Sequence, residues 1–325
     1  MHYLLIDCFL RSIGVIVCVF NHKNARNQYH VSLASLWTAQ FEYRNKSVST
    51  AIKSNPIHGC GHQHSLVIEF PFTEAPIRAL ITTSNGWQSG FIPVSNSEPK
   101  GNYFLVGYSA ITENFFQEED RNVRYVKQLL VLTKWINYHL NIGFDHIAIY
   151  LDLDQPHYEF VFFMQTGLAD LVKRDKVSIE VFMNINREYL FYQQAFGMHC
   201  LERFRSKAKW FSPFDLDEYY DVRGAKQNLV DVILNVSKSS GNTTIQVVTQ
   251  FWGSPENVCW STNITSFTVK KESYIWGARE KCIFNLDYIK YYSVHMPTNP
   301  PDKVNPNPDL EVRLNHYKGF GCLEP

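Results

Sequence analysis

Apolar residues in the middle of the chain change repeatedly between helical and strand-like spacing. From Val126 to Leu140 they recur every three or four residues, which predicts a helix with one buried face, and Gly143 is placed to end it. Short continuous apolar runs on either side are typical of strands buried in a parallel sheet. The predicted elements alternate in the order strand 103–111, helix 126–140, strand 145–151, helix 158–168, strand 177–182, helix 190–204 and a strand at Trp210.

Such an alternation produces a mostly parallel sheet with right-handed crossovers and helices on its faces. The preceding residues, from about 31 to 112, instead have the pattern of short strands broken by Gly, Pro, Asn and Ser. We therefore predict an α/β fold preceded by a β-rich N-terminal region. The predicted division is an apolar lead at 1–20, a β-rich region at 21–112 and an α/β domain at 103–325.

The last third of the chain has a mixed pattern. A helix is predicted at 226–236, and residues 297–308 are rich in Pro and Asn, a composition often found in lids over substrates. Short apolar runs predict further strands near 245–252, 267–269, 282–285 and 291–295.

The N-terminal lead has two interpretations. Leu4–Phe20 is largely apolar but contains Asp7 and Arg11, whereas a membrane-spanning helix needs about 20 residues with few charges. It is therefore either a signal anchor or a buried strand. Lys23 and Arg26 follow the segment and no Lys or Arg precedes it, which by the positive-inside tendency would keep the body of the protein cytoplasmic.

Composition limits the class of protein. The chain has 325 residues, of which 45% are hydrophobic and 15% aromatic, enough to bury a large core in one large or two modest domains. Lys plus Arg (31) equals Asp plus Glu (31), so the formal charge is zero. A balanced charge does not favour a phosphate backbone as partner, and we expect no nucleic-acid binding.

Glycosylation sequons favour a secretory compartment. Seven cysteines are compatible with one or two disulfides and a free thiol in a lumenal protein, and also with a fully reduced set. The Asn-x-Ser/Thr sequons lie at Asn45, Asn235, Asn242 and Asn263.

The strongest chemical signal is an acidic motif after the strand at Trp210. Asp215 and Asp217 lie where that strand would leave the sheet, and in an extended segment both side chains would point to one face. Two carboxylates there suit Mg²⁺ or Mn²⁺, which prefer oxygen ligands. A calcium loop is excluded, because Tyr219 and Tyr220 occupy the places of its third ligand and glycine. A haloacid-type phosphatase is disfavoured, because Glu218 follows the second Asp and the motif lies late in the chain.

Four pieces in order give the chain a family resemblance. With these segments the chain resembles glycosyltransferase family 92, which was long known as a domain of unknown function and includes eukaryotic β-galactosyltransferases. The match covers roughly 103–319. The pieces are Trp135–Tyr150 with its Gly143-Phe-Asp-His146, Gln194–Arg203 with His199-Cys200, Asp215-Leu-Asp217-Glu218, and Asn315-His316-Tyr317.

The resemblance implies a GT-A fold with a Rossmann-like sheet, and an enzyme that moves a sugar, galactose by analogy, from a UDP-sugar to a glycan acceptor. It further implies an inverting transfer with Mn²⁺ or Mg²⁺ in the lumen of the Golgi or another secretory membrane compartment. A metal acting as a Lewis acid would stabilise the charge that accumulates on the departing diphosphate.

The resemblance also suggests roles for single residues. Asp217 would bind the metal directly, with Asp215 reaching the metal or the donor's ribose. His316 is the first candidate for a histidine ligand from late in the chain, and His295 the second. Arg279 and Lys281 are candidates to contact the diphosphate. Glu256 and Asp287 are the candidates for the general base.

Two departures leave an alternative open. Family members often have an acidic residue where this chain has Lys134, and Phe where it has Tyr219. Neither position is a predicted metal ligand. The alternative is a catalytically inactive carbohydrate-binding or interaction protein on the same fold.

Overall fold

The computed structural model describes a chain of two compact units. Side chains are described mainly from residue 102 onward. The residues whose backbone the structure describes are 3–12, 15–22, 37–42, 47–52, 57–58, 65–71, 78–83, 88–95, 102–112, 120–153, 158–183, 189–224, 228–240, 244–253, 269–271, 280–289 and 302–317.

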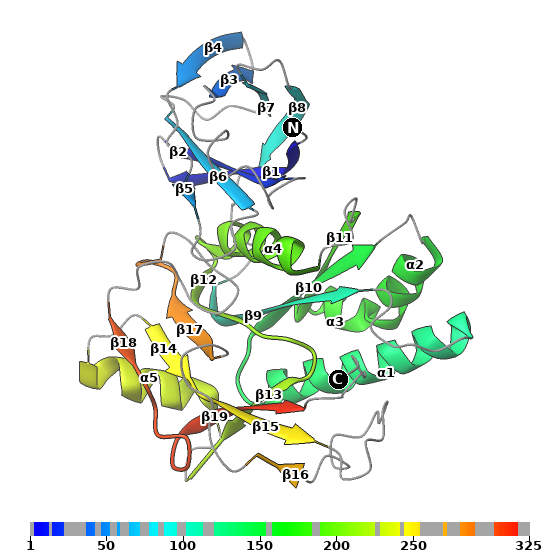
Figure 1. Cartoon of the computed structure of the whole chain (residues 1–325), viewed down its shortest axis with the longest axis vertical. Coiled ribbons are helices and arrows are strands. Elements are labelled where there is room, and N and C mark those ends of the chain that lie inside the picture. Colours follow the sequence, from blue (N-terminus) through cyan, green and yellow to red (C-terminus); the bar gives the residue numbers. More distant parts are fainter. Residues whose placement is uncertain are drawn as a thin grey trace. The chain divides into compact units, whose positions relative to one another are not determined.

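The first unit comprises Met1–Asn102, Glu188–Lys207 and Tyr291–Val294. Its elements are β1 (Tyr3–Ser12), β2 (Val15–His22), β3 (Trp37–Glu42), β4 (Ser47–Ile52), β5 (Ile57–His58), β6 (Ser65–Pro71), β7 (Arg78–Thr83), β8 (Gln88–Ser95) and α4 (Tyr189–Phe204). The strands form one eight-stranded sheet in the order β4-β3-β7-β8-β1-β2-β6-β5 (Figure 1). The helix α4 packs on β1, β2 and β6.

The described residues of the apolar lead at 1–20, which are 3–12 and 15–20, are not helical. These residues form β1 and β2, an antiparallel pair in which Leu5 lies opposite Phe20. Of the two interpretations, the strand agrees with the structure and the anchor is not supported. Among the residues that the structure describes, no helix is both long enough and apolar enough to cross a membrane.

The second unit comprises Tyr103–Arg187, Ala208–Lys290 and His295–Pro325. Its strands are β9 (Tyr103–Thr112), β10 (His146–Leu153), β11 (Val177–Met183), β12 (Ala208–Pro213), β13 (Glu218–Val222), β14 (Thr244–Val247), β15 (Thr249–Gly253), β16 (Val269–Lys270), β17 (Lys281–Asn285), β18 (Lys303–Val304) and β19 (Val312–Tyr317). Its helices are α1 (Arg121–Asn141), α2 (Tyr158–Gly167), α3 (Ala169–Lys173) and α5 (Leu229–Ser240).

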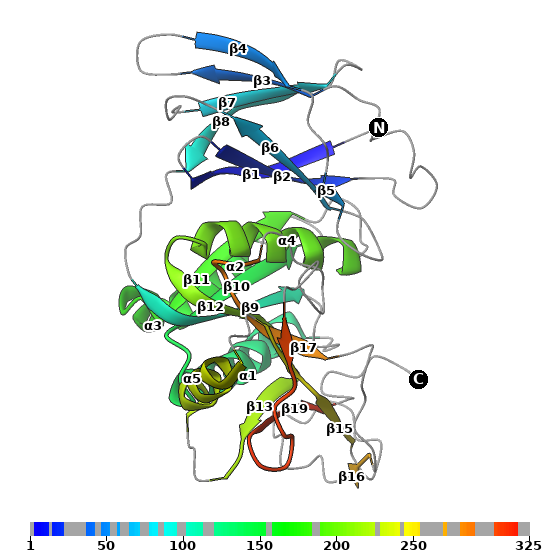
Figure 2. The same ribbon diagram turned by 90° about the vertical axis from the view of Figure 1, so that its left-hand side faces the viewer.

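A seven-stranded sheet forms the centre of this unit, in the order β11-β10-β9-β12-β17-β14-β18. The first four strands are parallel, as the alternating pattern predicts, while β17 runs antiparallel to both of its neighbours. The mixed α/β class with flanking helices is therefore confirmed. The helices α1 and α5 lie on the same side of the sheet (Figures 1 and 2).

Helix α1 ends next to Gly143 as predicted, but it begins at Arg121, five residues before the predicted start at Val126. The Asp120 carboxylate accepts hydrogen bonds from the backbone N–H groups of Asn122 and Val123, at 2.8 and 3.1 Å. At the other end the chain turns through Gly143, whose φ of 116° is accessible at low cost only to glycine. The helix presents the fully buried Trp135 and Ile136 to the core.

Both faces of the central strands β9, β10, β12 and β17 are largely buried, and they differ in chemistry. The face towards α1 and α5 is largely aliphatic, with Ile147 and Ile149 at 0% exposure. The opposite face has stacked or edge-on rings of Tyr108, Tyr150 and Phe211. A sheet buried on both sides explains why its strands lack polar–apolar alternation in the sequence.

A second sheet of four strands, in the order β13-β19-β15-β16, carries the end of the acidic motif. The strands β13 and β19 were not predicted. The run 245–252, predicted as one strand, is two: β14 belongs to the seven-stranded sheet and β15 to the four-stranded one. A continuous apolar run contains no signal for the residue at which the chain moves from one sheet to another.

The predictions for residues 291–295, for residues 297–308 and for the cysteines are tested only in part. The predicted strand 291–295 lies outside the described residues. Within the predicted loop 297–308, residues 303–304 form β18, which pairs with β14. Cys200 and Cys282 are buried, and Cys282 is a free thiol.

Candidate active site

The acidic motif lies in a turn between the two sheets of the second unit. The strand β12 ends at Pro213, and the backbone N–H of Glu218 donates to the carbonyl oxygen of Asp215 at 3.0 Å. The expectation of an extended segment with both aspartates on one face is therefore wrong. Phe214 and Leu216 are buried, at 1% and 3% exposure, and they anchor the turn in the core.

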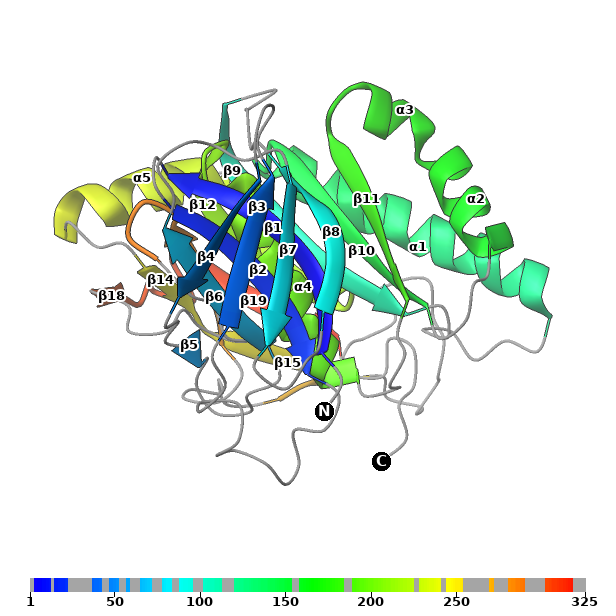
Figure 3. The same ribbon diagram turned by 90° about the horizontal axis from the view of Figure 1, so that it is seen from above.

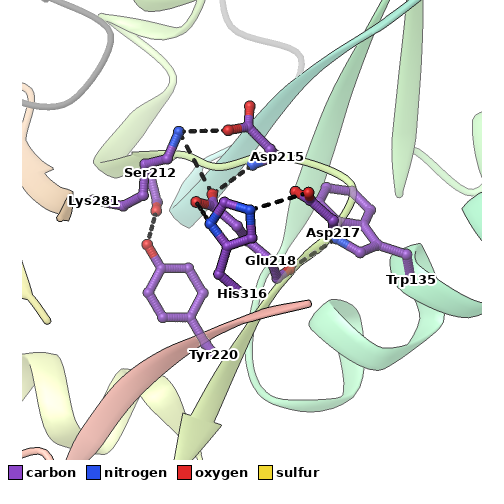
Figure 4. A network of polar contacts seen from close by, with 8 residues as sticks. All are labelled: Trp135, Ser212, Asp215, Asp217, Glu218, Tyr220, Lys281 and His316. Carbon is purple, nitrogen blue, oxygen red and sulfur yellow. Dashed lines mark hydrogen bonds and ion pairs between the residues drawn. The ribbon is translucent and has the colours of Figure 1, made fainter. Parts of the chain in front are cut away.

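Because the segment turns, the two aspartates have different partners. The Asp217 carboxylate lies 3.1 Å from Nε2 of His316, and the Asp215 carboxylate lies 2.9 Å from Nζ of Lys281 (Figure 4). His316 comes from β19, which pairs with β13 so that His316 lies opposite Glu218. The chain thus brings together residues from three separate segments.

His316 is held as a cation by its neighbours. Burial alone would lower its pKa, but the charge and hydrogen bond of Asp217, together with the charges of Glu218 and Asp215, raise the pKa of His316 to about 9. The side chains of His316 and Asp217 remain 18% and 22% exposed. They are therefore reachable by a ligand.

Ion pairs connect five side chains into one cluster, which consists of Asp215, Asp217, Glu218, Lys281 and His316. Glu218 and Lys281 are its most buried members. Their side chains are 2% and 1% exposed, and Oε2 of Glu218 lies 3.5 Å from Nζ of Lys281. Oε2 also accepts the backbone N–H of Asp215 at 2.8 Å. Burial raises the pKa of Glu218 to about 7, against the opposing effect of Lys281 and with a smaller contribution from Asp215. Oε1 of Glu218 lies 3.5 Å from Nδ1 of His316. Glu218 therefore connects the Asp215–Lys281 pair to the Asp217–His316 pair.

Side chains of α1 and β12 fix the strand that carries Glu218. The indole Nε1–H of Trp135 donates to the carbonyl of Glu218 at 3.0 Å, and the hydroxyl of Tyr138 donates to the carbonyl of Tyr220 at 2.8 Å. The Tyr220 hydroxyl lies 2.7 Å from the hydroxyl of Ser212 (Figure 4). These contacts tie β13 to α1 and β12, so the cluster rests on three rigid elements.

The donor set of Asp217 and His316 fits a divalent metal, provided that the metal displaces the proton that makes His316 a cation. Two neighbouring ligand atoms in an octahedral shell, each about 2.1 Å from the ion, are about 3.0 Å apart, which is close to the 3.1 Å between Asp217 and His316. A carboxylate with one imidazole suits Mn²⁺. Among the described residues, however, no three His, Cys, Asp or Glu side chains form a ready metal cage. The remaining ligands would have to come from a bound substrate and water.

The other predicted site residues lie elsewhere or outside the described part. Asp287 follows the far end of β17, which extends about 13 Å from Lys281 to Asn285 at roughly 3.3 Å per residue. The structure therefore does not bring Asp287 to the cluster. Glu256, Arg279 and His295 lie outside the described residues, and their predicted roles stay predictions. The predicted diphosphate contact of Lys281 also stays a prediction, although Lys281 lies in the cluster.

Sequence reasoning assigned no role to Glu218, Trp135 or Tyr138 in this site. Glu218 had a visible signal, because it adjoins the two aspartates. Nothing local marks Trp135 and Tyr138, whose partners lie 83 and 82 residues away.

One family model matches most of the domain that contains this site. The model, described as glycosyltransferase family 92, covers residues 122–319. This range includes every member of the cluster. Among curated proteins no significant match was found.

The solved structures that resemble the chain do so weakly. The cytochrome b5 reductase domain of Ulva prolifera nitrate reductase has 8% identity and a TM-score of 0.17, with 57% of this chain and 74% of that one covered. The flavohem-like FAD/NAD binding domain of nitric oxide dioxygenase from Vibrio cholerae has 9% identity and a TM-score of 0.17, with 66% and 98% covered. Likenesses this low carry no argument about fold or function.

Proposed function

The chain belongs to glycosyltransferase family 92, and from this premise we propose that it is a metal-dependent, inverting transferase that moves galactose from UDP-galactose to a glycan acceptor. The membership itself supports glycosyl transfer between a sugar donor and an acceptor. The donor sugar, the metal, the inverting course and the GT-A arrangement of the fold are parts of the proposal.

The observation that carries the proposal is the pairing of Asp217 with His316. Both side chains are partly exposed at the carboxyl edge of β9 and β12, which is where open α/β sheets bind nucleotides. Their donor atoms are spaced as neighbouring metal ligands would be. A Mn²⁺ ion held there would neutralise charge on the diphosphate as it leaves the sugar.

The remaining members of the cluster position these groups. Glu218 approaches both His316 and Lys281, and its Oε2 holds the backbone N–H of Asp215, so it fixes the geometry of the turn. Asp215 is 30% exposed and is oriented by Lys281, and its proposed role is to reach the metal or the ribose. The general base is assigned to Glu256 in preference to Asp287, because Asp287 lies beyond the far end of β17.

The compartment is also part of the proposal. Asn235 lies exposed on α5 in one of the four sequons, as glycosylation would require. Together with the family's usual setting, this supports a lumenal location in the Golgi or another secretory compartment.

The proposal is tested by UDP release from a panel of UDP-sugars with Mn²⁺ and a glycan acceptor. We expect turnover with UDP-galactose that requires the metal, and a loss of about 10³-fold in Asp217→Ala, comparable to removing one key charge-stabilising group from an active site. The matched control is Asp231→Ala, which removes an exposed carboxylate on α5 and should leave turnover unchanged. Turnover that is equal in wild type and Asp217→Ala would refute the assigned site.

One observation favours the alternative of a carbohydrate-binding protein without turnover. The Asp215 carboxylate is already paired with a buried lysine, which competes with a metal for the same oxygens. Glycan binding on an array, with no UDP release at any Mn²⁺ concentration, would establish this alternative instead.

A further inference from the structure

The outer face of α1 is unusually apolar for an exposed surface. Val123, Val126 and Leu130 are 42%, 56% and 46% exposed. At 100° per residue they fall within one stripe of the helix, roughly opposite to the buried Tyr125 and Trp135. Isolated exposed apolar residues are common, but a stripe of them needs an explanation.

Helix α2 continues this apolar surface. It runs beside α1 in the same direction, because Arg121 pairs with Glu159 at 3.6 Å near both N-termini and Tyr125 packs on Phe160. Further along, a methyl group on Gly167 would collide with Leu129, so the two helices touch closely (Figure 3). On α2 the outward-facing aromatic side chains are also exposed, at 79% for Tyr158 and 71% for Phe162.

The charge of α1 is entirely positive. The helix contains Arg121, Arg124, Lys127 and Lys134, and neither Asp nor Glu. By helical geometry Lys127 and Lys134 lie along the side of the apolar stripe that is remote from α2. The surface therefore presents exposed aliphatic and aromatic side chains bordered by the cations of α1, and the one acidic side chain of α2, Glu159, is paired with Arg121.

We propose that the outer face of α1 and α2 binds the surface of a bilayer that contains anionic lipids. Interfacial helices have this composition, with Lys or Arg beside an apolar face that enters the boundary between headgroups and acyl chains. Aromatic rings such as those of Tyr158 and Phe162 are favoured at that depth. The cations supply the electrostatic complement to acidic headgroups, which is the reason for choosing a lipid surface over a second copy of the chain.

The position of this surface in the fold has a functional consequence. Helices α1 and α2 follow β9 and β10, so both begin at the carboxyl edge of the parallel strands, the edge that carries the acidic motif. Docking through the N-terminal halves of these helices would hold that edge near the membrane. Membrane binding by this face does not require the proposed transferase activity.

The test is co-sedimentation of the full chain with vesicles of phosphatidylcholine alone or with about one third phosphatidylserine. We expect binding to the anionic vesicles that weakens at about 1 M salt, where the Debye length is about 3 Å. Lys127→Glu should weaken binding by at least about fivefold, as expected for a cation near an acidic surface. The double variant Val126→Asp and Phe162→Ser should abolish it.

Two controls keep the result specific. Leu310→Asp changes a side chain that is 67% exposed on a different segment, and it should bind vesicles like the wild type. Circular dichroism and thermal unfolding identify any variant that has lost its fold. Binding that is absent in the wild type, or equally strong in Leu310→Asp and the double variant, would overturn the proposal. So would concentration-dependent dimerisation that the double variant abolishes, because the face would then bind a second copy.

Discussion

Two histidines of the same domain are largely removed from water, yet their pKa values move in opposite directions. His139 is fully buried among rings, with the centroids of Phe214 and Trp135 at 4.5 and 4.7 Å, and burial lowers its pKa to about 3 against a weaker opposing effect of the Trp135 carbonyl. His316 is also desolvated, but the carboxylate of Asp217 outweighs burial and brings its pKa to about 9. Neighbouring charge, rather than depth, decides which histidine is a cation.

The contrast arises within one short segment of chain. Phe214 and Tyr220 turn inward and pack around His139, whereas Asp217 and Glu218 turn towards His316. Residues 214–220 therefore contribute side chains both to an apolar cluster around His139 and to an ionic cluster around His316. The apolar side chains should contribute mainly to stability through packing, and the ionic side chains through charge pairing. Substitutions on the two sides should therefore change the unfolding free energy by different amounts and in different ways.

The largest effect on stability is expected on the apolar side. Trp135→Ala removes a fully buried indole together with its hydrogen bond to the Glu218 carbonyl, which should cost about 3–5 kcal/mol of unfolding free energy. Denaturant titration measures the loss. The control, Leu130→Ala on the exposed face of the same helix, should change stability by less than about 0.5 kcal/mol. Equal losses in both variants would show that α1 does not support the site through Trp135.

On the ionic side, Lys281→Met should cost about 3 kcal/mol of unfolding free energy, because it removes the buried cation that Glu218 and Asp215 share. Adding Glu218→Gln should recover part of that loss, and the double-mutant cycle gives the coupling energy directly. The exposed Lys238→Met on α5 is the control and should be nearly neutral. Additive losses in the cycle would mean that the two side chains do not interact.

The pH dependence of the unfolding free energy tests the lowered pKa of His139. His139 has a folded pKa of about 3, below its ordinary 6.5, so the unfolded chain binds the proton first. Its contribution to stability is complete above pH 6.5 and is lost as the pH falls from 6.5 towards 3, at about 1.4 kcal/mol per pH unit.

Unfolding titrations of wild type and His139→Phe at several pH values check this slope. The variant should lose stability less steeply than the wild type between pH 6 and 4, by about that amount per pH unit. Parallel curves for the two proteins would mean that His139 is protonated in the folded state.

The smallest expected effect concerns the link between α1 and β13. Tyr138→Phe removes the hydroxyl that bonds the Tyr220 carbonyl, which should cost about 1 kcal/mol. Tyr288→Phe, at a position 61% exposed, is the matched control and should be silent. If the two variants were equally stable, the edge of β13 would not depend on this bond.

The sequence predicts the alternating part of the fold because the signals there are local. Helix α1 is an example, since its apolar spacing and Gly143 can be read within one stretch of chain. The four-stranded sheet has no such signal, because β13 pairs with β19 across more than 90 residues and each strand is short. Register between distant strands depends on packing that a linear pattern does not contain.

For the candidate site, the chemical types were predictable and the geometry was not. The acidic motif and His316 were identified as partners, and the structure brings Asp217 and His316 together. The separate directions of Asp215 and Asp217 depend on a turn stabilised by Glu218, which alternation along an extended strand does not anticipate. The burial of Lys281 likewise depends on its distant acidic partners.

The bonds from Trp135 and Tyr138 to the carbonyls of β13 have a consequence for how this protein avoids self-association. A sheet's outermost strand normally offers free carbonyls on which another polypeptide can align and polymerise. Here α1 occupies two of those acceptors along β13. At the opposite border β16 is only two residues long, too brief a template for cross-β growth. Loss of the contacts between α1 and β13 would therefore be expected to expose these carbonyls and to promote edge-to-edge aggregation.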